Sequence, residues 1–343
     1  MNKENSDNLK KNVRLCYVND ESPGYYRKKR GKGFAYFDNE EKKVKSKSIK
    51  KRFDNLVIPP AWTDVWICKK PNGHIQVTGR DAKERKQYIY HPKWEEKQNE
   101  NKFSRTKYFG RNLPKIRRKI AKDLRKKNLT REKVLALIIL LLEETLIRIG
   151  NDVYARENKS FGLTTLKNKH IEVNGSQICF SFKGKSGKNV EVDIKDKRLA
   201  RIITQCQEIP GQHLFQFKDE DGMIHSITSN DVNEYIAEIA GEDFSAKDFR
   251  TWGGTVTAAK ELFNIGDFET KKDGGKNIVQ AVRNVAEALN NTPAVCRKYY
   301  IHPDILKSYL NKKLFSILQK EMGKKSSKFG LEPEEKTVLK VVK

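Results

Sequence analysis

The chain has 343 residues, which is enough for about two domains with a core each. Lysine and arginine number 70 against 44 aspartate and glutamate, so the formal net charge is +26. The longest apolar run, Val134 to Leu142, is far below the ~20 residues of a membrane span, and the first residues are polar, unlike a signal peptide. These features exclude a membrane protein and predict a cytoplasmic one.

The positive charge is unevenly distributed along the chain. Formal charges sum to +21 over residues 1–130 and to only +5 over residues 131–343. This asymmetry predicts a basic region that clamps a polyanion, joined to a globular domain with a separate function. Nucleic acid is the first candidate for the polyanion. The five cysteines are scattered without C-x-x-C spacing, so we expect neither a zinc site nor a disulfide framework.

The first part of the chain predicts a small β-rich domain. Residues 13–51 mix short apolar pieces with basic runs and glycines, and a turn at Pro71-Asn72-Gly73 separates two further strand patterns. After a basic run come Gln87, Tyr88 and Tyr90. The two tyrosines would share one face of a strand, and that face is either part of the core or a surface that reads DNA bases.

A polar run after His91-Pro92 predicts an interdomain linker. A helix expected over Arg131–Ile149 carries the long apolar run and would be the buried centre of a second domain. Arg148 at its end either complements the helix dipole or binds an anion. The expected organisation is an N-terminal DNA-clamp domain over residues 1–94, a linker over 95–106, a catalytic domain over 107–322 and a mobile tail over 323–343.

Three antiparallel strands are expected in the second domain. Asn174-Gly175 is the strongest two-residue hairpin signal, and apolar residues alternate on both sides of Gly184-Lys185-Ser186. Lys185 therefore lies at a glycine-flanked tip, where it is either solvated or reaches into a groove as a cation and proton donor. The tip does not match a nucleotide-binding P-loop, because neither the first glycine nor the following helix is present.

From Leu199 onward the chain is expected to be mainly helical. A helix beginning near Ser245 places Arg250 in its first turns, where a cation gains nothing from the dipole and more plausibly serves a bound anion. A basic loop is expected over residues 271–276, followed by a helix over 277–289. The latter leads to a short stretch that contains Tyr299 and Tyr300.

These tyrosines allow two interpretations. They either pack between helices, or one of them is a nucleophile. A neutral tyrosine is a poor nucleophile, because its reference pKa is about 10, so attack by its oxygen needs nearby cations. Arg297 and Lys298 are close in sequence, although two exposed helix charges would look the same.

At this point the sequence resembles the type IB DNA topoisomerases, in particular their compact poxvirus and bacterial form. The resemblance extends from about Val57 to Leu306, and six motifs follow the order of the family. They are Gly79-Arg80-Asp81 to Gln87-Tyr88-Ile89-Tyr90, Arg148-Ile149-Gly150, Gly162 through His170, Gly184-Lys185, Lys247 through Gly253, and Thr292-Pro293 through Tyr300.

The resemblance implies an α+β protein, with a small β-rich N-terminal domain and a mainly helical catalytic domain that contains a three-stranded antiparallel sheet. It implies that Tyr300 is the nucleophile, that Arg148 and Arg250 clamp the phosphate and that Lys185 is the general acid. Asn291 stands where the poxvirus and nuclear enzymes have histidine, as expected of the bacterial branch; it can donate a hydrogen bond to a phosphate oxygen but cannot carry a proton at neutral pH. The implied DNA-contacting residues are Gln87, Tyr88, Tyr90, Tyr154 and Lys247.

The implied activity is relaxation of supercoiled duplex DNA through a 3′-phosphotyrosyl intermediate, strand rotation and religation, without ATP or metal. We expect a monomer that forms a clamp around DNA and associates with the nucleoid. A tyrosine recombinase shares the order Arg, Lys, Arg, Tyr but acts as a synaptic tetramer and usually has a helical N-terminal domain. A non-enzymatic architectural DNA-binding protein is the alternative from another class.

Overall fold

The computed structural model describes residues 14–31 and 33–343. Contacts divide the chain into two compact units, the first ending at Lys102 and the second beginning at Phe103. This division falls within the segment 95–106 that the sequence predicts as a linker. The segment is helical, because α2 extends from Pro92 to Asp123. The first 13 residues of the expected N-terminal domain lie outside the described part of the chain.

The N-terminal unit is an antiparallel sheet of five strands in the order β2-β1-β3-β4-β5. Helix α1 begins after Ser46, whose side chain accepts a hydrogen bond from the backbone of Ile49. It buries Phe53 against the apolar face of the sheet, in one cluster with Ile67 and Val77. The elements are β1 (Gly24–Arg30), β2 (Gly33–Phe37), α1 (Lys47–Asn55), β3 (Thr63–Cys68), β4 (Ile75–Arg80) and β5 (Lys86–Tyr90).

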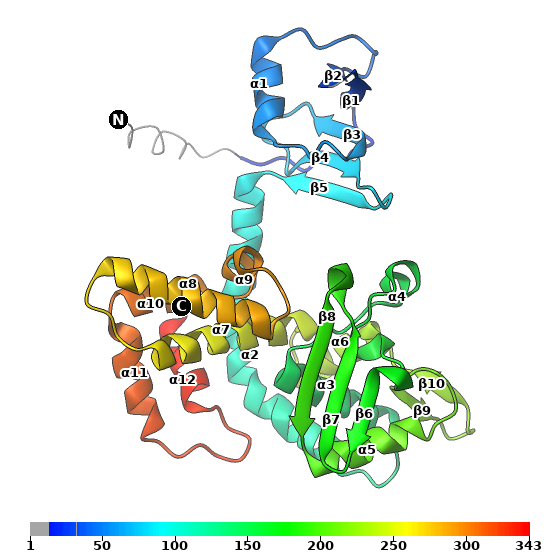
Figure 1. Ribbon diagram of the computed structural model, residues 1–343, viewed down its shortest axis with the longest axis vertical. Helices are drawn as coiled ribbons and strands as arrows, with labels where there is room; N and C mark the ends of the chain where they lie inside the picture. The colour runs from blue at the N-terminus through cyan, green and yellow to red at the C-terminus, as the bar shows by residue number, and fades with distance from the viewer. Residues whose placement is uncertain (1–13, 32) are drawn as a thin grey trace. The chain divides into compact units, whose positions relative to one another are not determined.

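Helix α3 belongs to the main core of the C-terminal unit, as expected, and packs on α6 and α7 (Figure 1). Every residue from Val134 to Ile139 is fully buried. No helix in the described part of the chain is long and apolar enough to cross a membrane. The helices are α3 (Arg131–Thr145), α4 (Asp152–Asn158), α5 (Lys197–Gln207), α6 (Ser229–Ala240), α7 (Ala246–Ile265), α8 (Lys271–Ala288), α9 (Pro293–Tyr299), α10 (Pro303–Leu310), α11 (Lys313–Met322) and α12 (Pro333–Val341).

The predicted three-stranded sheet is present, and its order is β6-β7-β8. Its strands are β6 (Ile171–Asn174), β7 (Gln177–Lys183) and β8 (Asn189–Lys195), and a separate two-stranded ribbon is made of β9 (Gln216–Lys218) and β10 (Ile224–Ser226). Asn174 pairs with Gln177, so the Asn-Gly signal correctly locates the first hairpin. Ile178, Phe180 and Phe182 are buried on one face of β7. The predicted α+β fold class is confirmed.

Helix α3 ends earlier than the sequence predicts. Its last residue is Thr145, and Leu146 adopts the left-handed conformation with φ of 54°. The side chain of Leu146 packs against Gly253 of α7 so closely that a Cβ there would lie 2.4 Å from it. Arg148 is therefore not a residue of the last helical turn but belongs to the irregular segment that follows α3. The packing of Leu146 against α7 ends the helix there, although the apolar pattern that predicts the helix continues to Ile149.

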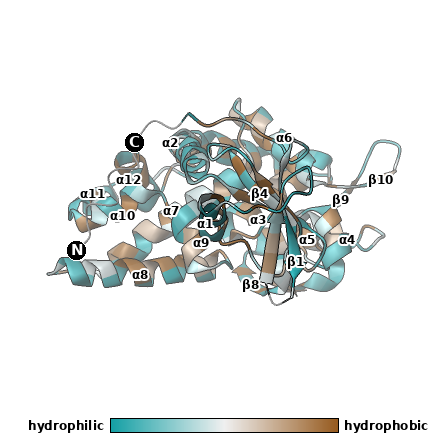
Figure 2. Ribbon diagram, turned by 90° about the horizontal axis from the view of Figure 1, so that it is seen from above, coloured by the Kyte–Doolittle hydropathy of each residue, from teal (hydrophilic) through white to brown (hydrophobic). Residues whose placement is uncertain are grey.

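The prediction of a loop over residues 271–276 is also wrong, because these residues form the first turns of α8. Thr270 caps the helix by accepting a hydrogen bond from the backbone of Asp273. Gly274 is tolerated within the helix because Phe268 packs on it, at 2.9 Å from the position that a Cβ would occupy. Hydrophobic and hydrophilic residues alternate along α8, as expected for a helix with one buried side (Figure 2).

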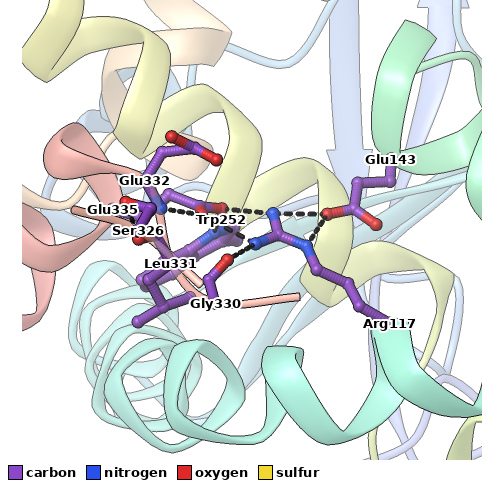
Figure 3. A network of polar contacts seen from close by, with 8 residues as sticks. All are labelled: Arg117, Glu143, Trp252, Ser326, Gly330, Leu331, Glu332 and Glu335. Carbon is purple, nitrogen blue, oxygen red and sulfur yellow. Dashed lines mark hydrogen bonds and ion pairs between the residues drawn. The ribbon is translucent and has the colours of Figure 1, made fainter. Parts of the chain in front are cut away.

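The prediction of a mobile tail over residues 323–343 is wrong as well. Helix α12 packs on α7 and α11, and Val338 and Val342 are buried in the main core. A polar network centred on Arg117 of α2 fixes its first turn (Figure 3). The Arg117 Nη1 and Nη2 atoms donate to both carboxylate oxygens of Glu335, at 3.0 and 2.8 Å.

Every nitrogen of the Arg117 guanidinium has a partner in this network. Its Nε donates to Glu143 of α3 at 2.7 Å, and Nη1 also donates to the carbonyl of Gly330 at 2.7 Å. Trp252 of α7 donates its indole N–H to Glu335 at 3.0 Å. Burial works against the charge on Arg117, but Glu143 and Glu335 raise its pKa above the ordinary value. The acidic stretch that looks solvated in sequence thus supplies a buried carboxylate.

We expect Glu335→Ala to lower the free energy of unfolding by about 1–3 kcal/mol, because it removes the acceptor of the Trp252 indole and two of the hydrogen bonds of Arg117, whose charge keeps Glu143 as its partner. Urea unfolding of the whole protein measures this. Glu334→Ala, one residue away on the same helix, is the matched control and should change the stability by less than about 0.5 kcal/mol. Equal effects of the two substitutions would contradict a specific role for the network.

Candidate active site

Two arginines hold the short connection between α8 and α9. Arg148, from the irregular segment after α3, donates through Nη1 to the carbonyl of Asn290 at 3.3 Å. Arg250, from the second turn of α7, donates through Nη2 to the carbonyl of Leu289 at 3.0 Å. Asn290 has a positive φ of 44°, which turns these successive carbonyls toward the two guanidiniums. Segments more than 100 residues apart thereby meet at one turn.

Neither arginine has an ion-pair partner in the part of the chain that the structure describes. Arg250 is only 5% exposed, and its Nε is buried without a hydrogen-bond partner. Burial and, to a smaller extent, the charge of Arg148 lower the pKa of Arg250 to about 10, although Tyr300 opposes both effects. Burial likewise lowers the pKa of Arg148. Two desolvated cations without a carboxylate are the setting in which a bound anion is most strongly favoured.

Tyr300 lies directly after α9 and faces Arg250. The guanidinium carbon of Arg250 is 5.4 Å from the centroid of the Tyr300 ring. Thr292 caps α9 by accepting a hydrogen bond from the backbone of Val295, and the following residue, Pro293, takes the first helical position. The backbone N–H of Tyr300 closes the helix by donating to Cys296 at 2.9 Å. This short helix therefore determines where the tyrosine is presented.

Two residues of α7 that the sequence analysis missed also position Tyr300. The hydroxyl of Thr255 donates to the carbonyl of Tyr300 at 3.2 Å and accepts from the backbone N–H of His302 at 3.1 Å. A Cβ on Gly254 would lie 2.9 Å from the same carbonyl, so only glycine fits there without a shift. The run Gly253-Gly254-Thr255 was the available sequence signal, since small residues within a helix indicate close approach of another segment.

Lys185 lies at the tip between β7 and β8, where Ser186 and Gly187 have φ of 63° and 72°. The tip is anchored to the α8–α9 connection, because Lys188 donates to the carbonyl of Asn291 at 3.4 Å. The side chain of Asn290 donates to the carbonyl of Asn189 at 2.8 Å. Lys188 and Asn290 are further site residues that the sequence analysis missed. Both side chains donate to backbone carbonyls, which every residue has, so no residue pattern in the sequence indicates these contacts.

Six of the ten predicted site residues line one cavity. Its volume is about 320 Å³, and the six are Arg148, Tyr154, Lys185, Lys247, Arg250 and Tyr300. An adjoining cavity of about 400 Å³ is also lined by Arg148, Lys185 and Arg250. Asn291 is not among the residues that line either cavity, and its side-chain oxygen accepts from the backbone of Thr292 at 3.1 Å.

The remaining three predicted residues lie on β5 in the N-terminal unit. Tyr88 and Tyr90 share one face of this edge strand, as expected, and their rings stack with centroids 5.8 Å apart. Tyr88 is 42% exposed, so this face is not core at that position. Gln87 points to the other side and donates to Asp81 at 3.0 Å.

The arrangement combines a phenol, a buried and a partly buried guanidinium and a primary amine around one small cavity. No group of three or more His, Cys, Asp or Glu side chains within residues 14–31 and 33–343 is placed to hold a metal ion. The chemistry available from these side chains is attack by an oxygen nucleophile on an anionic centre, with the guanidiniums balancing the charge and the amine donating a proton.

Comparison with known proteins gives the family. Residues 91–327 match the catalytic core of eukaryotic DNA topoisomerase I, and residues 33–81 match the N-terminal domain of bacterial DNA topoisomerase IB. DNA topoisomerase 1B of Acanthamoeba polyphaga mimivirus is 36% identical over 306 residues, which are 87% of this chain and 90% of that protein. The chain belongs to the type IB DNA topoisomerases, which are isomerases, and the resemblance found in the six motifs is confirmed.

Two other proteins are more distantly similar. DNA topoisomerase 1B of vaccinia virus (strain Copenhagen) is 26% identical over 275 residues, which are 78% of this chain and 83% of that protein. A crystal structure of the XerH site-specific recombinase bound to its difH substrate has a TM-score of 0.37 and 18% identity, and covers 56% of this chain and 49% of that chain. That similarity is too low to carry an argument about function.

The buried charge of Arg250 makes a prediction about stability. Arg250→Met should raise the free energy of unfolding by about 1 kcal/mol, because it removes a desolvated cation that faces another cation. Urea unfolding measures the change, and Arg118→Met on the exposed side of α2 is the control, expected within about 0.5 kcal/mol of the parent protein. Added sulfate should stabilise the parent protein more than the variant. A variant less stable than the control would contradict this electrostatic account.

Proposed function

We propose that this chain relaxes supercoiled duplex DNA by transient cleavage of one strand, with Tyr300 as the nucleophile. The observation that carries the proposal is the cavity in which Tyr300, Lys185 and two arginines without ion-pair partners meet. A phosphodiester is the anion that fits both this cavity and a net charge of +26. The names of the similar viral proteins point to the same substrate.

In the proposed step the Tyr300 oxygen bonds to phosphorus, the phenolic proton leaves to solvent, and the bond from phosphorus to the 5′ oxygen breaks. Lys185 gives its proton to that oxygen, so a 5′ hydroxyl is released. Arg148 and Arg250 balance the charge that develops on the non-bridging oxygens, and Asn291 donates a further hydrogen bond there. In the present structure Asn291 bonds locally, so its proposed role requires the side chain to turn when DNA binds.

The covalent bond between Tyr300 and the 3′ phosphate retains the energy of the phosphodiester, so religation needs no ATP. The strand with the free 5′ hydroxyl rotates about the intact strand, and the hydroxyl then attacks the phosphotyrosine. We propose that the protein does this as a monomer in the cytoplasm, on the DNA of the nucleoid. The N-terminal unit, with Gln87, Tyr88 and Tyr90, and the C-terminal unit, with Tyr154 and Lys247, would close around the duplex as a clamp.

Two alternative functions can be distinguished from the proposed one by experiment. A tyrosine recombinase would assemble four copies on two duplexes, whereas the proposed enzyme binds as one copy per duplex in sedimentation. An architectural DNA-binding protein would bind without forming a covalent adduct. Family membership supports the topoisomerase over both.

Substitution of the nucleophile tests the reaction. The parent protein and Tyr299→Phe should relax negatively supercoiled plasmid in EDTA without ATP, whereas Tyr300→Phe should not, because it lacks the attacking oxygen. Denaturation during the reaction should trap a protein–DNA adduct only in the two active proteins. Relaxation by Tyr300→Phe, or a supercoiled plasmid with the parent protein, would overturn the proposal.

Substitution on β5 tests the clamp. In the Tyr300→Phe background, Tyr88→Ala with Tyr90→Ala should weaken binding to a short duplex by roughly fivefold, as expected when about 1 kcal/mol of polar contact is lost. Fluorescence anisotropy measures the affinity. Tyr108→Ala, an exposed tyrosine that is 59% accessible, is the control. Unchanged affinity in the double variant would exclude this face of the N-terminal unit from the DNA interface.

A further inference from the structure

Lys185 is carried by a tip that burial does not hold in place. Residues 185–189, between β7 and β8, are all exposed, whereas the strand residues on either side pack into the main core. Inside the tip, the backbone N–H of Gly184 donates to the carbonyl of Lys188 at 2.8 Å. This bond shapes the turn but does not fix it against the rest of the unit. Within residues 14–31 and 33–343, Lys185 itself forms no hydrogen bond or ion pair.

Two hydrogen bonds connect this tip to the α8–α9 connection. The side-chain amide of Asn290 donates to the carbonyl of Asn189 at 2.8 Å. In the opposite direction, Lys188 donates to the carbonyl of Asn291 at 3.4 Å, which is beyond the usual length of an N–H···O bond. The side chain of Asn290 therefore makes the stronger of the two contacts.

Asn290 also links the tip to Arg148. Its carbonyl accepts from Arg148 Nη1 at 3.3 Å, and its φ of 44° is a conformation that asparagine adopts more often than most residues. Arg148, Lys185, Asn189 and Asn290 line the same cavity of about 400 Å³. One residue thus contacts the arginine through its main chain and the strand next to the lysine through its side chain.

The position of the tip matters because of what a general acid requires. A proton donor works only at hydrogen-bond distance from the oxygen that it protonates, about 2.6–3.2 Å. A misplacement of about 1 Å can slow a reaction by about 100-fold. Since the lysine side chain is a flexible four-carbon stem, the backbone of the tip is the part that the fold can fix.

We propose that Asn290 is a positioning residue for Lys185. Its side-chain hydrogen bond holds the β7–β8 tip against the connection that also contacts Arg148, which keeps the Lys185 ammonium next to the phosphate that Arg148 binds. This inference rests on the proposed function, in which Lys185 gives its proton to the leaving 5′ oxygen. Asn290 acts through Lys185 and not on the reacting atoms.

The leaving group distinguishes this role from a structural one. In a duplex with sulfur in place of the bridging 5′ oxygen at the cleavage site, the P–S bond breaks and a thiolate leaves. A thiol has a pKa of about 8.5, so the thiolate needs no proton donor. An alkoxide needs one, because its conjugate acid is about as weak as water, with a pKa of about 15.7. A misplaced proton donor therefore slows cleavage with oxygen but not with sulfur.

Asn290→Gly removes the side-chain hydrogen bond, while glycine retains the positive φ and the carbonyl that Arg148 contacts. In a single turnover with the oxygen substrate, the Tyr300 adduct should form roughly 10- to 100-fold more slowly than in the parent protein. With the sulfur substrate, the rate should lie within about threefold of the parent rate. Lys185→Ala should show the same dependence on the leaving group, with a larger loss.

Two further variants serve as comparisons. Thr255 contacts the carbonyl of Tyr300 and not the tip, so Thr255→Val should lose the same factor with oxygen and with sulfur. Lys188→Met removes the weaker contact at an exposed position, where folding is not at risk. It should show the leaving-group dependence of Asn290→Gly with a smaller loss.

An equal loss in Asn290→Gly with both leaving groups, or full activity of this variant with oxygen, would overturn the inference. If urea unfolding shows that Asn290→Gly no longer folds, Lys188→Met decides, and a rate without leaving-group dependence in that variant is the contrary result. A parent protein that forms no adduct with either substrate would instead contradict the proposed function itself.

Discussion

The site depends on one constraint: the buried Arg250 and the partly buried Arg148 line one cavity, and within residues 14–31 and 33–343 neither forms an ion pair. Both donate to successive carbonyls of the α8–α9 connection, which holds them together against their mutual repulsion. Carbonyl dipoles compensate only part of the charge, so burial lowers the pKa of both arginines. The same connection receives Lys188 from the β7–β8 tip and leads into the helix that ends before Tyr300. The proposed nucleophile, the proposed phosphate clamp and the proposed proton donor therefore all depend on one turn.

Two arginines of this unit show how the surroundings distinguish a structural role from a proposed catalytic one. Arg117 has a partner for each of its nitrogens, two carboxylates among them, and joins three helices to α12. Arg250 is buried more deeply, yet in the part of the chain that the structure describes its Nε has no hydrogen-bond partner and its guanidinium forms no ion pair. A satisfied arginine stabilises the fold, whereas an unsatisfied one stores free energy that a bound phosphate can release. Residue type alone does not separate the two cases.

The sequence by itself determined the fold class, the β7–β8 hairpin and the burial of α3, because alternation, an Asn-Gly turn and a nine-residue apolar run are local patterns. The predicted roles of Tyr300, Lys185 and the two arginines came from six ordered motifs, and the tertiary structure decided that these residues line one cavity. It also decided the end of α3, the first turns of α8 and the docking of α12. The contacts of Leu146 with Gly253 and of Arg117 with Glu335 join distant segments, whereas Phe268 packs on Gly274 within one short stretch of the chain. A local pattern carries no information about distant partners, and for the same reason the contact of Thr255 with Tyr300 was found only in the tertiary structure.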